Sequence, residues 1–188
     1  MEWEFFILEN IRKYVRTDFL NTLAKMIAPF WLIVVLIGVP AVILLVTRKH
    51  ARLGRMIGAS AAVNALICIL TLKPIVSRLR PYELNSTVAM LVPPESDASF
   101  PSGHTSFAFC AATACFIYNK KAGIIAYIFA LIIAFSRLYL YMHFPTDVIC
   151  GALVGIIAAI IGNFIEGKLF GSPRTLPKRA EHLAAETN

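Results

Sequence analysis

The sequence predicts an all-α integral membrane protein, a helical bundle of about five transmembrane helices with an N-terminal interfacial helix. Residues of the set AVILMFWYC make up 58% of the 188 residues, only 15% are charged, and the apolar residues gather in five long stretches. A soluble domain typically has about 25% charged residues, so this composition excludes an ordinary soluble chain and a disordered one. The length suits one domain, residues 1–188.

Each apolar stretch is close to the length that a membrane-spanning helix needs. The first has 21 residues without a charge, which at 1.5 Å per residue gives about 31 Å, enough for the hydrocarbon core. The last carries Gly151, Gly155 and Ala159 at four-residue spacing, which predicts close helix packing. We expect spans at residues 26–46, 56–72, 102–118, 122–140 and 145–165.

The segment before the first span has an amphipathic pattern. Most of its charged residues fall on one side of a helical wheel, although Glu4 and Phe6 break the pattern. The apolar arc contains Trp3, Ile7, Ile11, Tyr14 and Val15. We expect residues 1–22 to form a helix along the membrane surface, with an ordinary water-facing helix as the alternative. The transmembrane core then occupies residues 23–167, and a flexible cytoplasmic tail occupies residues 168–188.

Basic residues beside the spans predict the orientation of the chain. Ten lie in two connections, around residues 48–55 and 120–121, and after the last span, and eight lie on the opposite face. The positive-inside rule places the first group in the cytoplasm, with the N-terminus outside and the C-terminus inside. The net charge of +7 would also suit a nucleic acid, but the basic residues form short islands between apolar runs, so no nucleic-acid partner is expected.

Three polar clusters near the span ends carry the candidate chemistry. Ionisable groups are rare in membrane helices and often mark function. Counting the predicted spans places all three on the non-cytoplasmic face, so we expect them to form one site. They are Lys73 to Arg80-Pro81, then Pro101-Ser102-Gly103-His104, and then Ser136-Arg137 with His143 and Asp147.

Part of this set suits a bound anion. Lys73, Arg80 and Arg137 can hold an anion with several oxygens, because a guanidinium fork matches phosphate and a lysine adds a point charge. Ser102 and Gly103 lie where a helix begins, and a helix N-terminus offers free N–H groups to the same anion.

The other part suits covalent and acid–base chemistry. His104 and His143 can divide the work of nucleophile and proton donor, and Asp147 can accept a hydrogen bond from an imidazole. The same three residues are conceivable metal ligands by type. Three adjacent cations would repel a divalent ion, so no metal is expected.

These clusters resemble the signature of the type 2 phosphatidic acid phosphatase superfamily. That signature is a lysine, six residues and Arg-Pro, then Pro-Ser-Gly-His, then Ser-Arg, five residues, His, three residues and Asp. Every defining position is filled between Lys73 and Asp147. Each piece alone is weak, but three pieces in order at suitable spacing make a specific signal.

The resemblance implies a role for each residue. His143 would attack phosphorus and form a phosphohistidine, Asp147 would orient it, and His104 would protonate the leaving oxygen and then activate water. The phosphate oxygens would be held by Lys73, Arg80, Ser102, Gly103 and Arg137. The resemblance implies no metal and no other cofactor.

The implied function is hydrolysis of a lipid-linked pyrophosphate or phosphate monoester, with undecaprenyl pyrophosphate favoured, at the extracytoplasmic face of the cell membrane. Phosphatidylglycerophosphate and phosphatidic acid are alternative substrates. A lipid phosphotransferase and a non-catalytic transporter or lipid-binding protein are alternative functions. The expected partners are the lipid phosphate substrate and membrane lipids, and the sequence does not predict an oligomeric state.

Neighbouring polar residues are interpreted more simply. Arg78 is expected to be a neighbour without a catalytic role, and Ser136 to form local hydrogen bonds. Glu83, Glu95 and Asp97, in the polar loop before the third span, are expected to be solvated.

Overall fold

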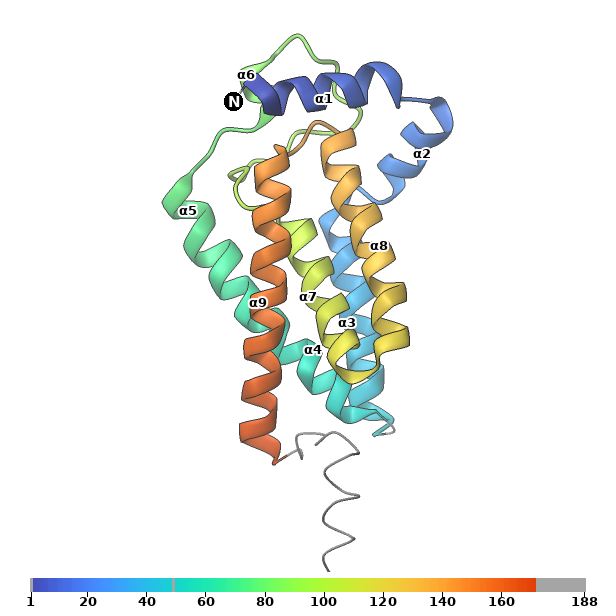
Figure 1. Cartoon of the computed structure of the whole chain (residues 1–188), viewed down its shortest axis with the longest axis vertical. Helices are drawn as coiled ribbons and strands as arrows, with labels where there is room; N and C mark the ends of the chain where they lie inside the picture. Colours follow the sequence, from blue (N-terminus) through green and yellow to red (C-terminus); the bar gives the residue numbers. More distant parts are fainter. Residues whose placement is uncertain (1, 49, 172–188) are drawn as a thin grey trace, which may run out of the picture.

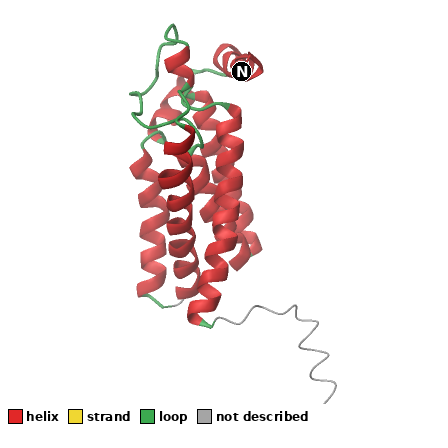
Figure 2. Ribbon diagram, turned by 90° about the vertical axis from the view of Figure 1, so that its left-hand side faces the viewer, coloured by secondary structure: helices red, strands yellow, loops and turns green. Residues whose placement is uncertain are grey.

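The structure, a computed structural model, describes residues 2–48 and 50–171. Every regular element within these ranges is a helix, which confirms the predicted all-α class (Figure 2). The final helix, α9 (Pro145–Phe170), extends past the predicted end of the core at residue 167. The rest of the predicted tail, from residue 172, lies outside the described residues.

Two helices, rather than the predicted single one, occupy the N-terminal segment. α1 spans Glu2–Tyr14 and α2 spans Asp18–Met26. The chain breaks between them because Thr17 caps α2, its hydroxyl accepting the N–H of Leu20 at 3.3 Å. The prediction of one helix over residues 1–22 was therefore wrong.

A second break separates α2 from α3 (Phe30–Val46), and the two helices are bent by 58°. Pro29 precedes α3 and has no N–H to donate. The carbonyls of Ile27 and Ala28 at this break accept hydrogen bonds from side chains instead. Both of the side chains involved belong to the predicted site.

The predicted second span is helical but not uniform. α4 (Ala51–Asn64) continues into a π-helix, η1 (Ala65–Leu72), and then into the short α5 (Lys73–Val76). π-Helical turns are rare and occur frequently at functional sites. Here the π-helix ends directly before Lys73. The apolar pattern of residues 56–72 predicted only a regular helix here.

Helix α7 (Gly103–Tyr118) is the centre of the bundle (Figure 1). It packs against α4, α8 (Lys120–Tyr139) and α9. The contact with α9 depends on the predicted small residues, because a Cβ at Gly155 would lie only 2.2 Å from the carbonyl oxygen of Ser106.

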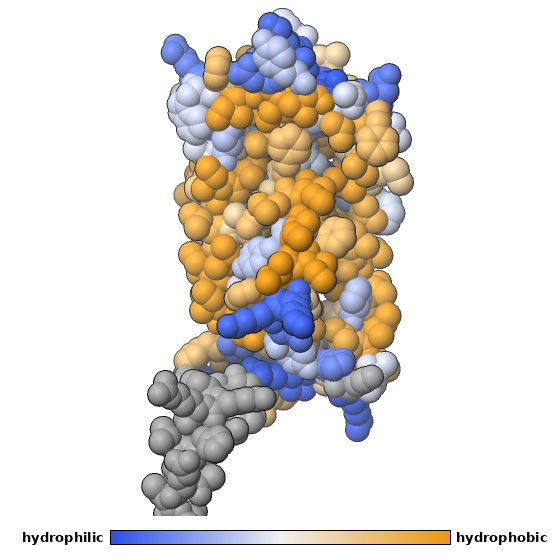
Figure 3. All heavy atoms as spheres, turned by 45° about the vertical axis from the view of Figure 1, so that its right-hand side comes forward, coloured by the Kyte–Doolittle hydropathy of each residue, from blue (hydrophilic) through white to orange (hydrophobic). Residues whose placement is uncertain are grey.

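The apolar surface suits a membrane. Three helical segments are long and apolar enough to cross one: Ala51–Leu84, Lys120–Tyr139 and Pro145–Phe170. The bent pair of α2 and α3 adds a fourth if the two helices are counted as one span. Figure 3 shows a broad apolar band between hydrophilic ends on the visible face. Helix α7 has 16 residues, about 24 Å at 1.5 Å per residue, which is short for a span. The long apolar segments make the chain a membrane protein. The number of five spans stays a prediction.

Helix α1 lies across one end of the bundle (Figures 1 and 2). Its inward face carries Glu4 and Leu8, both buried, while Trp3 and Tyr14 of the predicted apolar arc are exposed. Leu8 packs in a cluster with Tyr141 and Phe144 of the loop between α8 and α9. α1 therefore covers the loop that contains His143, and its contact with a membrane stays a prediction.

We expect Gly155→Ala to destabilise the bundle by about 1–3 kcal/mol, because the added methyl group forces α9 away from α7. Thermal unfolding in detergent measures this loss. Gly58→Ala is the matched control, since a Cβ at Gly58 in α4 meets nothing within 4 Å. Equal melting temperatures for the two variants would contradict the packing described here.

Candidate active site

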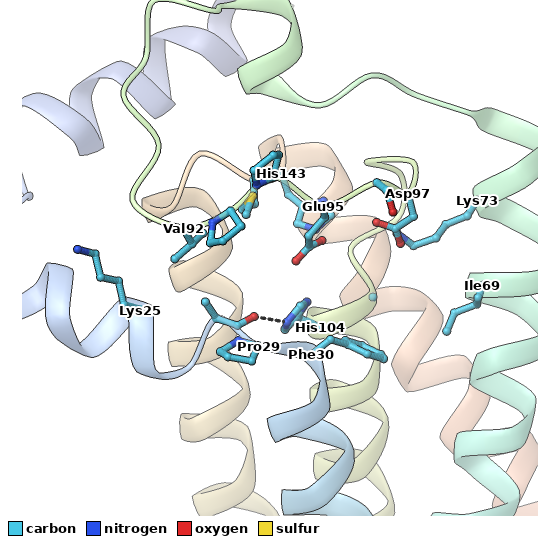
Figure 4. A pocket seen from close by; sticks show the side chains of 16 residues that line it. Lys25, Pro29, Phe30, Ile69, Lys73, Val92, Glu95, Asp97, His104 and His143 are labelled. Atoms are coloured by element: carbon cyan, nitrogen blue, oxygen red, sulfur yellow. Dashed lines mark hydrogen bonds and ion pairs between the residues drawn. The ribbon is translucent and has the colours of Figure 1, made fainter.

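The three predicted clusters meet at the end of the bundle that α1 covers. A cavity of about 600 Å³ opens there, and four predicted site residues line it: Lys73, Gly103, His104 and His143 (Figure 4). The remaining walls come mainly from the break between α2 and α3 and from residues 92–97 of the polar loop. The other four predicted residues, Arg80, Ser102, Arg137 and Asp147, are buried but do not line the cavity.

The hydrogen bonds of His143 define its tautomer. Its Nδ1 lies 2.7 Å from the carbonyl oxygen of Ser99, and because a carbonyl only accepts, Nδ1 carries the proton. Nε2 lies 3.4 Å from Nη1 of Arg80, which can only donate. The Nε2 lone pair is therefore held beside a cation at the cavity, as a nucleophile for an anionic centre requires.

Burial favours the neutral form of His143. The loss of solvent lowers the pKa of His143, and the nearby Asp147 opposes this effect without reversing it. A neutral imidazole keeps its lone pair at neutral pH. The electrostatics of this loop thus agree with the tautomer.

Asp147 is near His143 but is not bonded to it. Its Oδ2 lies 3.8 Å from Nδ1, beyond hydrogen-bond distance. The same oxygen accepts the hydroxyl of Ser99 at 2.6 Å and the N–H of Phe144 at 2.8 Å. Asp147 therefore holds His143 indirectly, through Ser99 and the start of α9, rather than by the direct hydrogen bond to an imidazole that its residue type allows.

Asp147 is fixed by a group of residues that were not among the predicted site residues. Arg78, expected to be a neighbour without a catalytic role, donates to Oδ1 of Asp147 at 2.6 Å and to Glu4 at 2.7 Å. Glu4 also accepts the hydroxyl of Thr146 at 2.6 Å. Glu4 interrupts the amphipathic pattern of α1, and that irregularity was the available signal for its inward position.

His104 and Arg137 share one acceptor. The carbonyl oxygen of Ala28 lies 2.8 Å from Nε2 of His104 (Figure 4). The same oxygen lies 3.1 Å from Nη1 of Arg137. Nε2 of His104 is therefore the protonated nitrogen. Arg137 also donates to the carbonyl of Ile27 at 3.1 Å and to the hydroxyl of Ser136, so the expected local role of Ser136 is confirmed.

The start of α7 joins the site to α9. The N–H of Ser102 donates to the carbonyl of Asp147 at 3.0 Å, and the hydroxyl of Ser102 accepts from Thr105. Gly103 lies on the cavity wall, where a Cβ would come 3.9 Å from Cε of Lys73. Ser102 and Gly103, both predicted to hold phosphate, thus lie together at the start of α7. Of the two, only Gly103 lines the cavity.

Acidic residues of the polar loop contact the remaining cations. Asp97 accepts from Nζ of Lys73 at 2.6 Å, and Glu95 accepts from Nη2 of Arg80 at 2.7 Å. Asp97 also pairs with Arg80. The expectation that Glu95 and Asp97 are merely solvated was wrong, because both side chains bind the cations of the predicted site.

The arrangement as a whole suits transfer of a phosphoryl group. It joins a neutral imidazole with a free lone pair, a second imidazole with an N–H, and cations beside one cavity. Such cations can stabilise the negative charge of a phosphoryl-transfer transition state. In the part of the chain that the structure describes, no three His, Cys, Asp or Glu side chains are grouped to hold a metal ion.

Known structures with a similar fold include two that cover most of this chain. The chain superposes on LpxE of Aquifex aeolicus with a TM-score of 0.70 and 28% identity, covering 81% of this chain and 90% of that one. It superposes on a PAP2-type phosphatidylglycerolphosphate phosphatase of Bacillus subtilis with a TM-score of 0.59 and 22% identity, covering 93% and 96% of the two chains. The second likeness concerns the fold alone.

Curated relatives are similar in sequence over part of their length. Undecaprenyl-diphosphatase BcrC of Bacillus subtilis is 38% identical over 117 residues, 62% of this chain and 56% of that protein. An undecaprenyl-diphosphatase of Sulfolobus acidocaldarius is 30% identical over 134 residues, 69% of this chain and 64% of that protein. The chain thus spans between half and two thirds of these relatives.

The family model described as the PAP2 superfamily matches residues 51–168, which is more than half of the chain and contains all three polar clusters. The family that these clusters resemble in sequence is therefore also the family found by comparison, and the chain belongs to the PAP2 superfamily.

Proposed function

We propose that this protein is a membrane lipid phosphatase that hydrolyses a lipid-linked pyrophosphate or phosphate monoester through a phosphohistidine at His143. The observation that carries the proposal is the state of that imidazole. Its Nδ1 proton is held by the carbonyl of Ser99, and its Nε2 is directed to Arg80 beside the cavity. A nucleophile is thus prepared next to a cation that can bind the phosphoryl oxygens.

The reaction takes two steps. In the first, Nε2 of His143 bonds to phosphorus, the bond from phosphorus to the leaving oxygen breaks, and His104 gives that oxygen a proton. In the second, His104 takes a proton from water, the water oxygen bonds to phosphorus, and the P–N bond breaks to release inorganic phosphate. The oxygens of the phosphoryl group are held by Lys73, Arg80 and Gly103. Ser102 and Arg137 lie at the edge of this phosphate-binding site.

His104 needs a second proton to act as the acid. Its Nε2 proton is donated to the carbonyl of Ala28, and a neutral imidazole does not give up its only proton near neutral pH. In the proposed cycle the charges of the bound phosphate therefore favour the imidazolium form. Nδ1 then gives its proton to the leaving oxygen and later takes one from water, while the Nε2 proton stays hydrogen-bonded to Ala28. Arg137 donates to the same carbonyl and so helps to hold this backbone acceptor in place.

The favoured substrate is undecaprenyl pyrophosphate, and two observations support it. Both of the curated relatives described above are named as undecaprenyl-diphosphatases. The lining of the cavity includes apolar residues such as Phe30 and Ile69, which suits a headgroup that enters while its chain stays in the bilayer. A release assay across undecaprenyl pyrophosphate, phosphatidylglycerophosphate and phosphatidic acid tests this choice.

The site is proposed to face the extracytoplasmic side. The opposite end of the bundle carries basic residues at the start of α4 and at the start of α8, among them Arg52, Arg55, Lys120 and Lys121. By the positive-inside rule this end faces the cytoplasm. Labelling of single cysteines placed at the two ends of the bundle in intact cells tests the orientation.

We expect His143→Ala to reduce turnover about 10³-fold or more, because no phosphoenzyme can form. We expect His104→Ala to retain the nucleophile and to accumulate an acid-labile phosphoenzyme when the substrate has a good leaving group. Trapping with a radiolabelled substrate measures both outcomes. Normal hydrolysis by purified His143→Ala protein would refute the covalent scheme.

We expect Arg78→Lys to lower kcat about tenfold, because an ammonium cannot bridge Glu4 and Asp147 as the guanidinium does. KM should stay nearly unchanged, since Arg78 does not line the cavity. Glu4→Gln, which keeps the shape but loses one charge of the bridge, should lower kcat less. A rise in KM without a fall in kcat would show that Arg78 binds substrate instead of positioning Asp147.

We expect Arg137→Lys to lower kcat about tenfold or more, since a lysine cannot donate to Ile27, Ala28 and Ser136 together. Steady-state kinetics and thermal unfolding on the same preparation measure the effect. Unchanged kinetics would contradict any role for Arg137 in the reaction.

A further inference from the structure

Two carboxylates of the loop between α6 (Pro81–Leu84) and α7 form ion pairs with the cations that are proposed to bind phosphate. Asp97 lies 2.6 Å from Nζ of Lys73 and also contacts Nη2 of Arg80, and Glu95 lies 2.7 Å from the same Nη2. Both acidic residues line the cavity together with His104 and His143 (Figure 4). The acidic side chains and the two imidazoles therefore share one space.

The guanidinium of Arg80 is saturated by the protein. Nε donates to the carbonyl of Asp97 at 2.9 Å, Nη1 donates to the carbonyl of Met142 at 3.2 Å, and Nη2 donates to the two carboxylates. Nζ of Lys73 likewise donates to Asp97 and to the carbonyl of Ala98 at 2.7 Å. A phosphoryl oxygen can therefore reach Nη2 only by replacing a carboxylate oxygen, whereas the two bonds of Nζ account for two of its three N–H groups.

The charges balance in this state, and only one side of each pair can move. Two carboxylates face two cations. The side chain of Arg80 is 0% exposed, whereas that of Asp97 is 54% exposed and that of Glu95 is 28% exposed. The cations are therefore fixed in the protein, and the carboxylates have solvent into which they can turn.

Asp97 stays ionised at neutral pH. Burial acts to raise the pKa of Asp97, but the hydrogen bonds and charges of Lys73 and Arg80 outweigh it and lower that pKa below its usual value. The carboxylate is thus present under the conditions in which a lipid phosphate would bind.

We propose that Glu95 and Asp97 are specificity-determining residues that compete with the substrate for Lys73 and Arg80, so that the site accepts a doubly charged terminal phosphoryl group and rejects a singly charged phosphodiester. This inference rests on the proposed function. A terminal phosphoryl group restores the two negative charges that the departing carboxylates remove. A phosphodiester brings only one, which leaves a buried cation without its counter-charge.

The competition has a clear purpose in a bilayer. Phospholipid diesters surround the protein at far higher concentration than any lipid-linked phosphate, and they can approach the cavity from the same surface. If Lys73 and Arg80 had no counter-charges, such headgroups would bind to them. Carboxylates that are already paired with these cations exclude the diester headgroups, but a more highly charged group can displace the carboxylates.

The test uses the isosteric variants Glu95→Gln and Asp97→Asn, singly and together, with Glu83→Gln as the control. The Glu83→Gln substitution removes one carboxylate charge from the neighbouring turn, as the test variants do from the loop. The carboxylate of Glu83 accepts from the backbone N–H of Arg80 rather than from its guanidinium. Calorimetric binding of inorganic phosphate to each purified protein in detergent is the first measurement. We expect the double variant to bind phosphate roughly tenfold more tightly than the unchanged protein, and the control to differ by about twofold at most.

The second measurement is competition by phosphatidylglycerol, a phosphodiester lipid, against bound phosphate. We expect it to displace phosphate from the double variant and not from the unchanged protein. Equal phosphate affinity in all proteins, or an equal gain in Glu83→Gln, would overturn the proposal. Asp97→Asn alone, with thermal unfolding as a check of folding, serves if the double variant does not fold.

These binding measurements need no turnover, so their result is separate from the proposed function. Failure of the unchanged protein to hydrolyse any lipid phosphate would refute the proposed function even if the carboxylates compete with phosphate. Hydrolysis together with unchanged phosphate affinity in the variants would refute only the specificity proposal.

Discussion

The structure depends on finding enough acceptors for buried cations at one end of a membrane bundle. Arg80 and Arg137 are both 0% exposed, and a buried charge without partners costs several kcal/mol. Arg137 takes its acceptors from the break between α2 and α3, and Arg80 takes them from the polar loop and from Met142. These cations therefore hold three irregular segments against the bundle. The carbonyls of these irregular segments accept hydrogen bonds from the buried guanidinium groups, and these bonds hold the segments in place.

The same principle connects the N-terminal helix to the reacting imidazole. Arg78 lies between Glu4 of α1 and Asp147 of α9, and Asp147 in turn holds Ser99, whose carbonyl holds His143. Leu8 adds an apolar contact over the loop that contains His143. A helix that looks in sequence like a membrane anchor is thus also part of the support of the site.

Much of this molecule was predictable because its patterns are local. Apolar stretches gave the helical class, and the spacing of Gly151, Gly155 and Ala159 indicated where α9 packs closely. The three motifs named the residues that the bundle brings to one end. The π-helix before Lys73 was not predictable, because no local pattern distinguishes it from an ordinary helix. The partners of charged residues were also not predictable, since Glu4 and Arg78 are 74 positions apart and only the tertiary fold makes them neighbours. Glu95 and Asp97 were misjudged for the same reason, because a polar loop is normally solvated.

The break between α2 and α3 has a practical consequence for anyone who maps this site by mutagenesis. The groups that bind His104 and Arg137 there are main-chain oxygens of Ile27 and Ala28, and every amino acid supplies such an oxygen. Replacement of these side chains leaves the oxygens in place, so a scan of the turn will make it look dispensable. Its contribution becomes visible only when the peptide bond itself is altered, for example by an ester linkage that weakens the carbonyl as an acceptor.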